Sequence, residues 1–128
     1  MKERARWCAS WIALLVLLVG GAFAADGTAT DRQEIEQLLD FVGTSGCDFI
    51  RNGIRHHPED AREHLAMKLS RAGGRVETAE DFVRYVATGS SITGRPYGVA
   101  CPGKKMIESR LWLITELERL RASRGVAP

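Results

Sequence analysis

Several residue types are scarce in this 128-residue chain, and each scarcity excludes a class of protein. With four prolines, thirteen glycines and no internal repeat, the chain is neither collagen-like nor a low-complexity segment. Apolar residues make up 45% of it and charged residues 27%, a balance that suits one folded domain and argues against disorder or a coiled coil. The length leaves no room for a second domain.

Charge is absent from one long stretch, which runs from Trp7 to Ala25. Three basic residues precede the apolar segment 11–19, and Ala22-Phe23-Ala24 has the small-residue pattern that signal peptidases cleave. We therefore predict a signal peptide over residues 1–24. The alternative is an uncleaved anchor, because 19 uncharged residues approach the length of a membrane span. Gly20 and Gly21 favour cleavage.

The predicted leader also accounts for the basic net charge. Residues 1–24 hold three basic side chains and one acidic, so the remaining 104 residues carry 15 of each. The net charge of +2 thus comes from the leader, and the mature protein lacks the basic excess that nucleic-acid binding needs. We expect a periplasmic or secreted protein with no nucleic-acid partner and, after cleavage, no stable membrane anchor.

Cys47 and Cys101 are the only cysteines beyond the leader, and such a pair in a small exported domain most often forms a disulfide. The bridge would close a loop of 55 residues, worth about 4 kcal/mol in the chain-entropy model. A metal site is the weaker alternative, because neither cysteine lies in a C-x-x-C motif or near a second close ligand.

The first half of the domain has the pattern of a helix, a hairpin and a second helix. Thr30 and Gln33 match a capping box ahead of apolar residues at helical spacing, which predicts a helix over about 31–42. Asn52-Gly53 favours a two-residue turn, so residues 47–51 and 54–57 are predicted to pair as antiparallel strands. Pro58 suits a first helical position and Gly73-Gly74 a helix end, which predicts a helix over about 58–72.

The second half predicts two more helices and one more strand. Thr78 and Asp81 favour the start of a helix that stops near Thr88-Gly89, residues 97–101 alternate like a strand, and Ser109 is expected to cap a last helix. The predicted fold is α+β: a small single domain in the order α-β-β-α-α-β-α, with helices over one face of a three-stranded antiparallel sheet. We assign residues 25–34 to a flexible N-terminal lead, 35–122 to the globular domain and 123–128 to a loose C-terminus.

A group of short motifs resembles a known family of exported bacterial proteins. The motifs are Ser45-Gly46-Cys47-Asp48-Phe49-Ile50-Arg51-Asn52-Gly53, His64-Leu65 with Lys68, Thr78-Ala79-Glu80-Asp81-Phe82, and Ser90-Ser91-Ile92-Thr93-Gly94 with Tyr97. Together they are similar to the YfeK-like family, a domain of unknown function, over roughly residues 35–121. The resemblance implies export and a single fold, and it implies no activity.

Two candidate catalytic or metal arrangements include His64. Ser90 or Ser91 with His64 as base would suit a small hydrolase, but no G-x-S-x-G motif surrounds either serine and no acid is placed to orient the histidine. The simpler interpretation is that the hydroxyls satisfy backbone groups in a turn. His56, His57 and His64 would suit a metal, but adjacent strand residues point to opposite faces, so exposed polar histidines are the simpler interpretation.

A third arrangement is a cationic pocket formed by Arg51, His64, Lys68 and Arg71, since His64 and Lys68 are one helical turn apart. Such a pocket would suit a carboxylate or phosphate. The simpler alternative is that nearby carboxylates, those of Asp48, Asp60 and Glu63, neutralise these side chains locally.

We therefore expect a non-catalytic binding or structural protein of the cell envelope, without a metal or cofactor. Its partner would be an envelope protein or a small anion. The candidate surface consists of Arg51, Asn52, His64, Lys68, Ser90, Ser91 and Tyr97.

Overall fold

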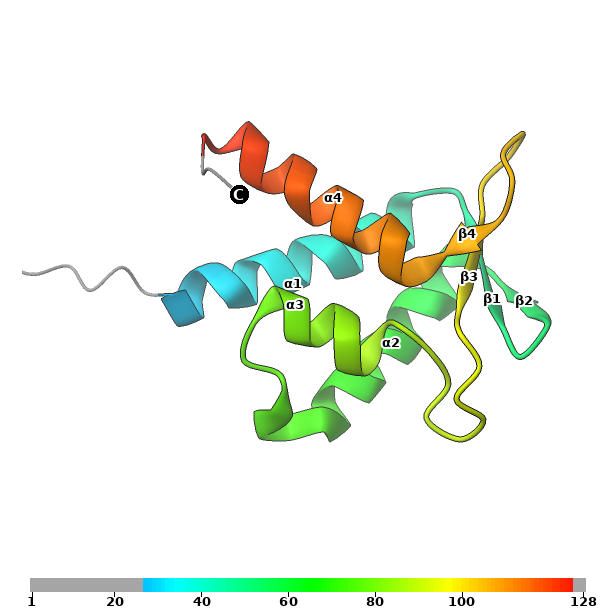
Figure 1. Ribbon diagram of the computed structural model, residues 1–128, viewed down its shortest axis with the longest axis horizontal. Helices are drawn as coiled ribbons and strands as arrows, with labels where there is room; N and C mark the ends of the chain where they lie inside the picture. Colours follow the sequence, from blue (N-terminus) through cyan, green and yellow to red (C-terminus); the bar gives the residue numbers. More distant parts are fainter. Residues whose placement is uncertain (1–26, 126–128) are drawn as a thin grey trace, which may run out of the picture.

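The structure is a computed structural model that describes residues 27–125, so the predicted signal peptide lies outside the described residues. The helices lie on one side of a single sheet, and α1 and α4 run alongside each other (Figure 1). The elements are α1 Gly27–Thr44, β1 Asp48–Arg51, β2 Ile54–His56, α2 Pro58–Ala72, a 3₁₀ turn Gly73–Arg75, α3 Ala79–Asp81, a π-helical turn Phe82–Val86, β3 Gly98–Ala100, β4 Ile107–Glu108 and α4 Ser109–Ser123.

The sheet has the strand order β2-β1-β3-β4, with every neighbouring pair antiparallel. The Asn52-Gly53 turn is confirmed: both residues have positive φ, 50° and 77°, as a two-residue hairpin turn of this kind requires. The predicted count of three strands was wrong, because β4 adds a fourth beside β3. A turn after Cys101, closed by the Lys104 amide donating to the Cys101 carbonyl at 3.1 Å, sends the chain back along β3.

Helix α1 is longer than predicted at both ends. It begins at Gly27, so Thr30 lies inside the helix and does not cap it, and part of the expected flexible lead is helical. No proline interrupts the chain between Gly27 and Thr44, and helix formation adds a hydrogen bond for each residue that joins. The predicted apolar face of this helix is confirmed as buried; it consists of Ile35, Leu38, Leu39 and Val42.

Helix α2 has the predicted bounds, whereas the third helix differs in kind. The Thr78–Asp81 capping box is confirmed, with the Asp81 amide donating to Thr78 Oγ1 at 3.0 Å and the Thr78 amide donating to Asp81 Oδ2 at 3.2 Å. After one α-helical turn the chain widens into a π-helical turn, in which the Ala87 amide donates to the Phe82 carbonyl at 3.1 Å. The predicted inward side chains of this segment, Ala79, Phe82, Val83 and Val86, are all buried.

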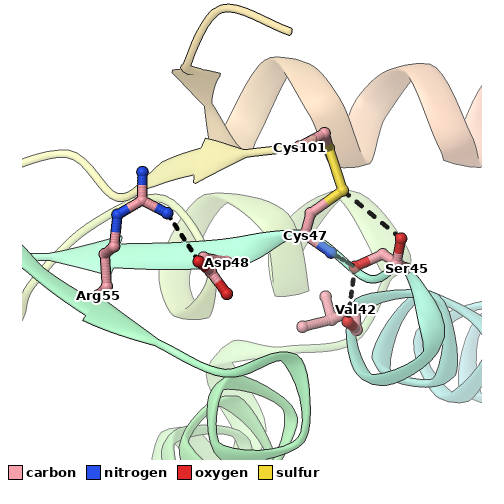
Figure 2. Close-up of a disulfide and its surroundings, with 6 residues drawn as sticks. All are labelled: Val42, Ser45, Cys47, Asp48, Arg55 and Cys101. Atoms are coloured by element: carbon pink, nitrogen blue, oxygen red, sulfur yellow. Dashed lines mark hydrogen bonds and ion pairs between the residues drawn. A yellow bond between two sulfur atoms is a disulfide. The ribbon is translucent and has the colours of Figure 1, made fainter. Parts of the chain in front are cut away.

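The predicted disulfide is confirmed between Cys47 and Cys101, whose Cα atoms lie 4.2 Å apart (Figure 2). It joins the residue before β1 to the residue after β3, so it fastens the centre of the sheet. Ser45 shapes the approach from α1, because its hydroxyl donates to the Val42 carbonyl at 3.0 Å and accepts from the Cys47 amide at 3.1 Å (Figure 2).

A buried carboxylate belongs to an ion-pair network that connects α1, α3 and α4. Glu34 of α1 is 2% exposed and pairs with Arg121 of α4 at 2.8 Å and with Arg124 just beyond it. Arg121 also pairs with Glu80 of α3 at 2.5 Å. The hydrogen bonds from Arg121 lower the pKa of Glu34 although burial acts in the opposite direction. This network fixes the N-terminal half of α1 against α4.

Candidate functional site

Four polar side chains from three parts of the chain converge beside the hairpin. They are Arg51 at the end of β1, His64 and Lys68 of α2, and Tyr97 just before β3, and we call them the basic cluster. Arg51 Nη1 lies 3.0 Å from each ring nitrogen of His64. His64 Nε2 lies 3.3 Å from the Tyr97 hydroxyl, which accepts a hydrogen bond from Lys68 Nζ at 3.0 Å. The structure thus brings together four of the seven residues of the predicted surface.

Local structure explains why these side chains meet. Arg51 follows Phe49 by two positions in β1, so both side chains point to the helical side of the sheet. His64 and Lys68 are one turn apart on the edge of α2 that faces β1. Tyr97 is 1% exposed, and both of its backbone polar groups form hydrogen bonds. Its amide donates to the Thr88 carbonyl at 3.0 Å, and its carbonyl accepts from the Ser109 amide at 2.9 Å.

The prediction that Ser109 caps α4 was wrong. Glu108 is the N-cap residue, and Ser109 is the first residue of the helix, fully buried. Its hydroxyl donates to the Ala87 carbonyl while its amide donates to Tyr97. Ser109 therefore ties α4 to the chain that carries Tyr97.

The Arg51–His64 contact favours a neutral imidazole. Arg51 Nη1 is equally close to both ring nitrogens, whose lone pairs diverge in the ring plane, so it lies over the face of the ring. A positive charge on the ring would be repelled by the guanidinium at this distance. Burial, with the charges of Arg51 and Lys68, lowers the pKa of His64 below its usual value, in agreement with this geometry. The arrangement therefore favours the neutral form of His64.

The ammonium of Lys68 forms two hydrogen bonds within the protein. Its ammonium donates to the Gly89 carbonyl at 2.8 Å as well as to Tyr97, so it fastens the 88–97 segment to α2. Burial, and then the charge of Arg51, lower its pKa. Lys68 thus contributes a charge to the basic cluster and also a structural link.

The carboxylates expected to neutralise this cluster form no ion pair with it in the described residues. Asp48 pairs with Arg55 at 2.7 Å and lies 3.9 Å from His57 (Figure 2 shows the first pair). Within residues 27–125, neither Asp60 nor Glu63 forms an ion pair. The expected neutralisation by ion pairs is not seen in the described part of the chain, and of the three carboxylates only Asp60 lines the cavity beside Arg51 and His64.

A cavity of about 130 Å³ opens beside Arg51 and His64. It lies between the hairpin and α2, and its lining consists of Phe49, Arg51, His56, Asp60, Ala61 and His64. His56 Nε2 is buried without a hydrogen-bond partner among the described residues. The interpretation of His56 as an exposed polar residue was wrong, because His56 pairs with Phe49 across the hairpin and so shares its inward face.

The remaining predicted residues lie elsewhere. Asn52 Oδ1 accepts from the Thr93 hydroxyl at 2.7 Å, which joins the hairpin turn to the 90–95 loop. Ser90 Oγ accepts from the amides of Ile92 and Thr93, both at 3.3 Å, so its expected role in a turn is confirmed. Ser91 is exposed, and in the described chain His64 bonds to Arg51 and Tyr97 and to neither serine. The geometry gives the hydrolase alternative no support.

The three histidines do not form a metal site in the structure. His57 is exposed beside Asp48, away from the cavity that His56 and His64 line. Over residues 27–125, no three His, Cys, Asp or Glu side chains come close enough to hold a metal ion. In the same range, no helix is both long enough and apolar enough to cross a membrane.

Comparison with known proteins places the chain in a family. A model described as "Family of unknown function (DUF5329)" matches residues 29–121, which include the cavity and the whole basic cluster. The chain belongs to this family. It is also 39% identical over 86 residues to the "Uncharacterized protein YfeK" of Salmonella typhimurium (strain LT2), a match that covers 66% of this chain and 72% of that protein. The resemblance found in the sequence motifs is confirmed. No solved structure matches the chain.

Proposed function

We propose that this protein is an exported, non-catalytic binding protein for a small anion, and that Arg51 and His64 bind that anion in the cavity beside them. The single observation that carries the proposal is the Arg51–His64 contact, in which a guanidinium lies 3.0 Å from an imidazole and neither group is ion-paired with a carboxylate in the described chain. A half-buried arginine ordinarily pairs with an acid, and an open arginine fork suits a carboxylate or phosphate.

Electrostatics supports an anion over a neutral ligand. The cavity and its surroundings contain Arg51 and Lys68, both half-buried, so the potential there is positive and only partly screened by water. An anion near Arg51 would gain Coulomb attraction and would relieve the repulsion between the cations. The exposed carboxylate of Asp60 at the cavity lining is the one opposing charge.

Export is supported by the leader pattern over residues 1–24 and by the disulfide, since such bonds persist mainly in oxidising compartments. A periplasmic or secreted location would make the anion a component of the cell envelope or its surroundings. An envelope protein that presents a carboxylate or phosphate to the same cavity would satisfy the same chemistry.

A melting-temperature screen tests the proposed function. The mature protein, residues 25–128, is heated at low salt with sodium phosphate, sulfate, acetate or succinate, and chloride serves as the reference anion. An anion at 100 times its Kd stabilises the native state by about 2.7 kcal/mol, which raises Tm by roughly 10–20 °C for a domain of this size.

Two variants locate the effect. Arg51→Gln removes the charge and the fork, so it should abolish the anion-dependent shift while its circular dichroism stays native. Arg75→Gln changes an exposed arginine of the 3₁₀ turn and should respond like the parent. The proposal is wrong if no anion raises Tm, or if Arg51→Gln and the parent shift equally.

A further inference from the structure

The ligand class and the chemistry of its binding follow from the cavity that contains Arg51, His56 and His64. This inference rests on the proposed function. We propose that the cavity binds a compact tetrahedral oxyanion, either a free ion such as phosphate or a phosphomonoester group, and that His64 takes up one proton when the anion enters.

The size of the cavity favours a small ligand. Its volume of about 130 Å³ is well below the roughly 300–1,000 Å³ of pockets for drug-sized molecules. A tetrahedral ion of five heavy atoms suits a cavity of this size. Phe49 and Ala61 close the inner wall, and both are buried in the core.

The hydrogen-bonding groups match the same ligand. Arg51 offers N–H donors at one wall, and His56 Nε2 lies in another wall, buried and without a partner. A buried polar atom of this kind costs free energy unless something bonds to it. An oxyanion would accept from Arg51 with one oxygen and from the Nε2–H of a His56 tautomer with another. The two oxygens of acetate lie in one plane, so they would contact fewer of the groups on Arg51, His56 and His64 than four tetrahedral oxygens would.

Proton uptake follows from the contact between Arg51 and His64. Arg51 Nη1 lies 3.0 Å from both ring nitrogens of His64, and this positive charge disfavours the imidazolium. An anion bound to Arg51 would offset that charge, so His64 could take up a proton and form a hydrogen bond to the anion through the new N–H. The proton comes from solvent and remains on His64, and no covalent bond forms or breaks.

The charged and titratable groups around His64 come from every element packed against it. Arg51 of β1, His56 of β2, and Lys68 and Arg71 of α2 all lower the pKa of His64, and Tyr97 contributes a hydroxyl. Asp60 of α2 is the one acidic group in the cavity lining. An added dianion reverses the balance of charge and favours the imidazolium.

Calorimetry of the mature protein with sodium sulfate tests the inference. Sulfate is a tetrahedral dianion that does not itself titrate between pH 5.5 and 8, so any pH dependence belongs to the protein. We expect affinity to rise as pH falls, by up to about tenfold per pH unit, which is the limit for uptake of one proton. Titrations in two buffers of different ionisation enthalpy should report about one proton taken up per sulfate near pH 7.

His64→Gln provides the matched variant, because glutamine keeps a hydrogen-bonding group but cannot take up a proton. It should bind sulfate with an affinity that no longer varies with pH. The buffer comparison on the parent needs no variant and decides the question even if His64→Gln fails to fold. Inorganic phosphate and methyl phosphate then separate the two sources: equal binding indicates an ester group in an open cavity, and exclusion of methyl phosphate indicates the free ion.

Three results overturn the inference in different ways. Sulfate binding that is independent of pH and releases or takes up no proton would overturn the role of His64 and leave the proposed function standing. Acetate binding as tightly as sulfate would overturn the tetrahedral ligand class. Failure of every anion to bind would overturn the proposed function as well.

Discussion

The ammonium of Lys68 lies 2.8 Å from the carbonyl oxygen of Gly89, twenty-one residues away in the sequence. Together with the bond from Lys68 to Tyr97, this contact holds the 88–97 segment on α2 and so positions Tyr97 beside His64. The basic cluster therefore depends on a lysine whose first role is to organise the fold around it.

Lys68→Met should destabilise the protein, because the methionine keeps most of the apolar stem but leaves the Gly89 carbonyl and the Tyr97 hydroxyl without their donor. We expect a loss of about 1–3 kcal/mol in the free energy of unfolding, measured with urea at pH 7. Lys105→Met removes an exposed lysine and serves as the control, with a change within about 0.5 kcal/mol. Equal effects of the two substitutions would show that the Lys68 bonds contribute nothing.

Glu34→Gln should also destabilise the protein, by about 1–3 kcal/mol at pH 7, because Arg121 and Arg124 lose a buried charged acceptor. The folded-state pKa of Glu34 is lowered, so its contribution is complete above pH 4.5 and is lost as pH falls below that value. Unfolding free energies measured from pH 7 to pH 3 should fall less steeply for Glu34→Gln than for the parent. Glu36→Gln, an exposed neighbour on the same helix, should behave like the parent.

Replacing both disulfide cysteines with alanine should lower the free energy of unfolding by about 2–5 kcal/mol. The parent treated with dithiothreitol should lose a similar amount, which controls for the two changes of side chain. Thiol titration of the non-reduced mature protein should detect no free thiols. Two titratable thiols in that preparation would contradict the bridge.

We predict that the protein recovered from the periplasm or the medium begins at Ala25 on N-terminal sequencing, because Ala22 and Ala24 supply the small side chains that signal peptidase requires. Ala24→Leu should block cleavage and leave the precursor in the membrane fraction, whereas Ala25→Ser should not. Recovery of the unprocessed parent chain, starting at Met1 and held in the membrane, would show that the segment is an anchor.

Periodicity predicted most of the fold, because the predicted inward positions of α1 and of the 79–86 segment carry their apolar side chains to the core. It missed β4, since Ile107 and Glu108 are too few to alternate visibly and become a strand only because a turn lays them along β3. It also missed the π-helical turn, because the spacing of Phe82, Val83 and Val86 fits an ordinary helix equally well.

The same kinds of sequence pattern predicted part of the candidate site. Helical spacing brought His64 and Lys68 together, and the predicted hairpin, packed near that helix, supplied Arg51. The role of His56 depended on the hairpin register: the Asn52-Gly53 turn places it opposite Phe49 and therefore inward. That signal was present in the sequence, but the pair His56-His57 was interpreted as exposed. The lack of a carboxylate partner depends on side-chain directions that no sequence pattern specifies.

The most direct test of the anion site uses the three histidines as built-in reporters. Proton–carbon NMR spectra of the imidazole rings are recorded at pH 6.5 while sodium sulfate is added at constant ionic strength. We predict that the ring signals of His56 and His64 shift in a saturable manner and that those of exposed His57 do not. Rings that all stay fixed, or a His57 signal that shifts as much as the other two, would contradict anion binding in the cavity.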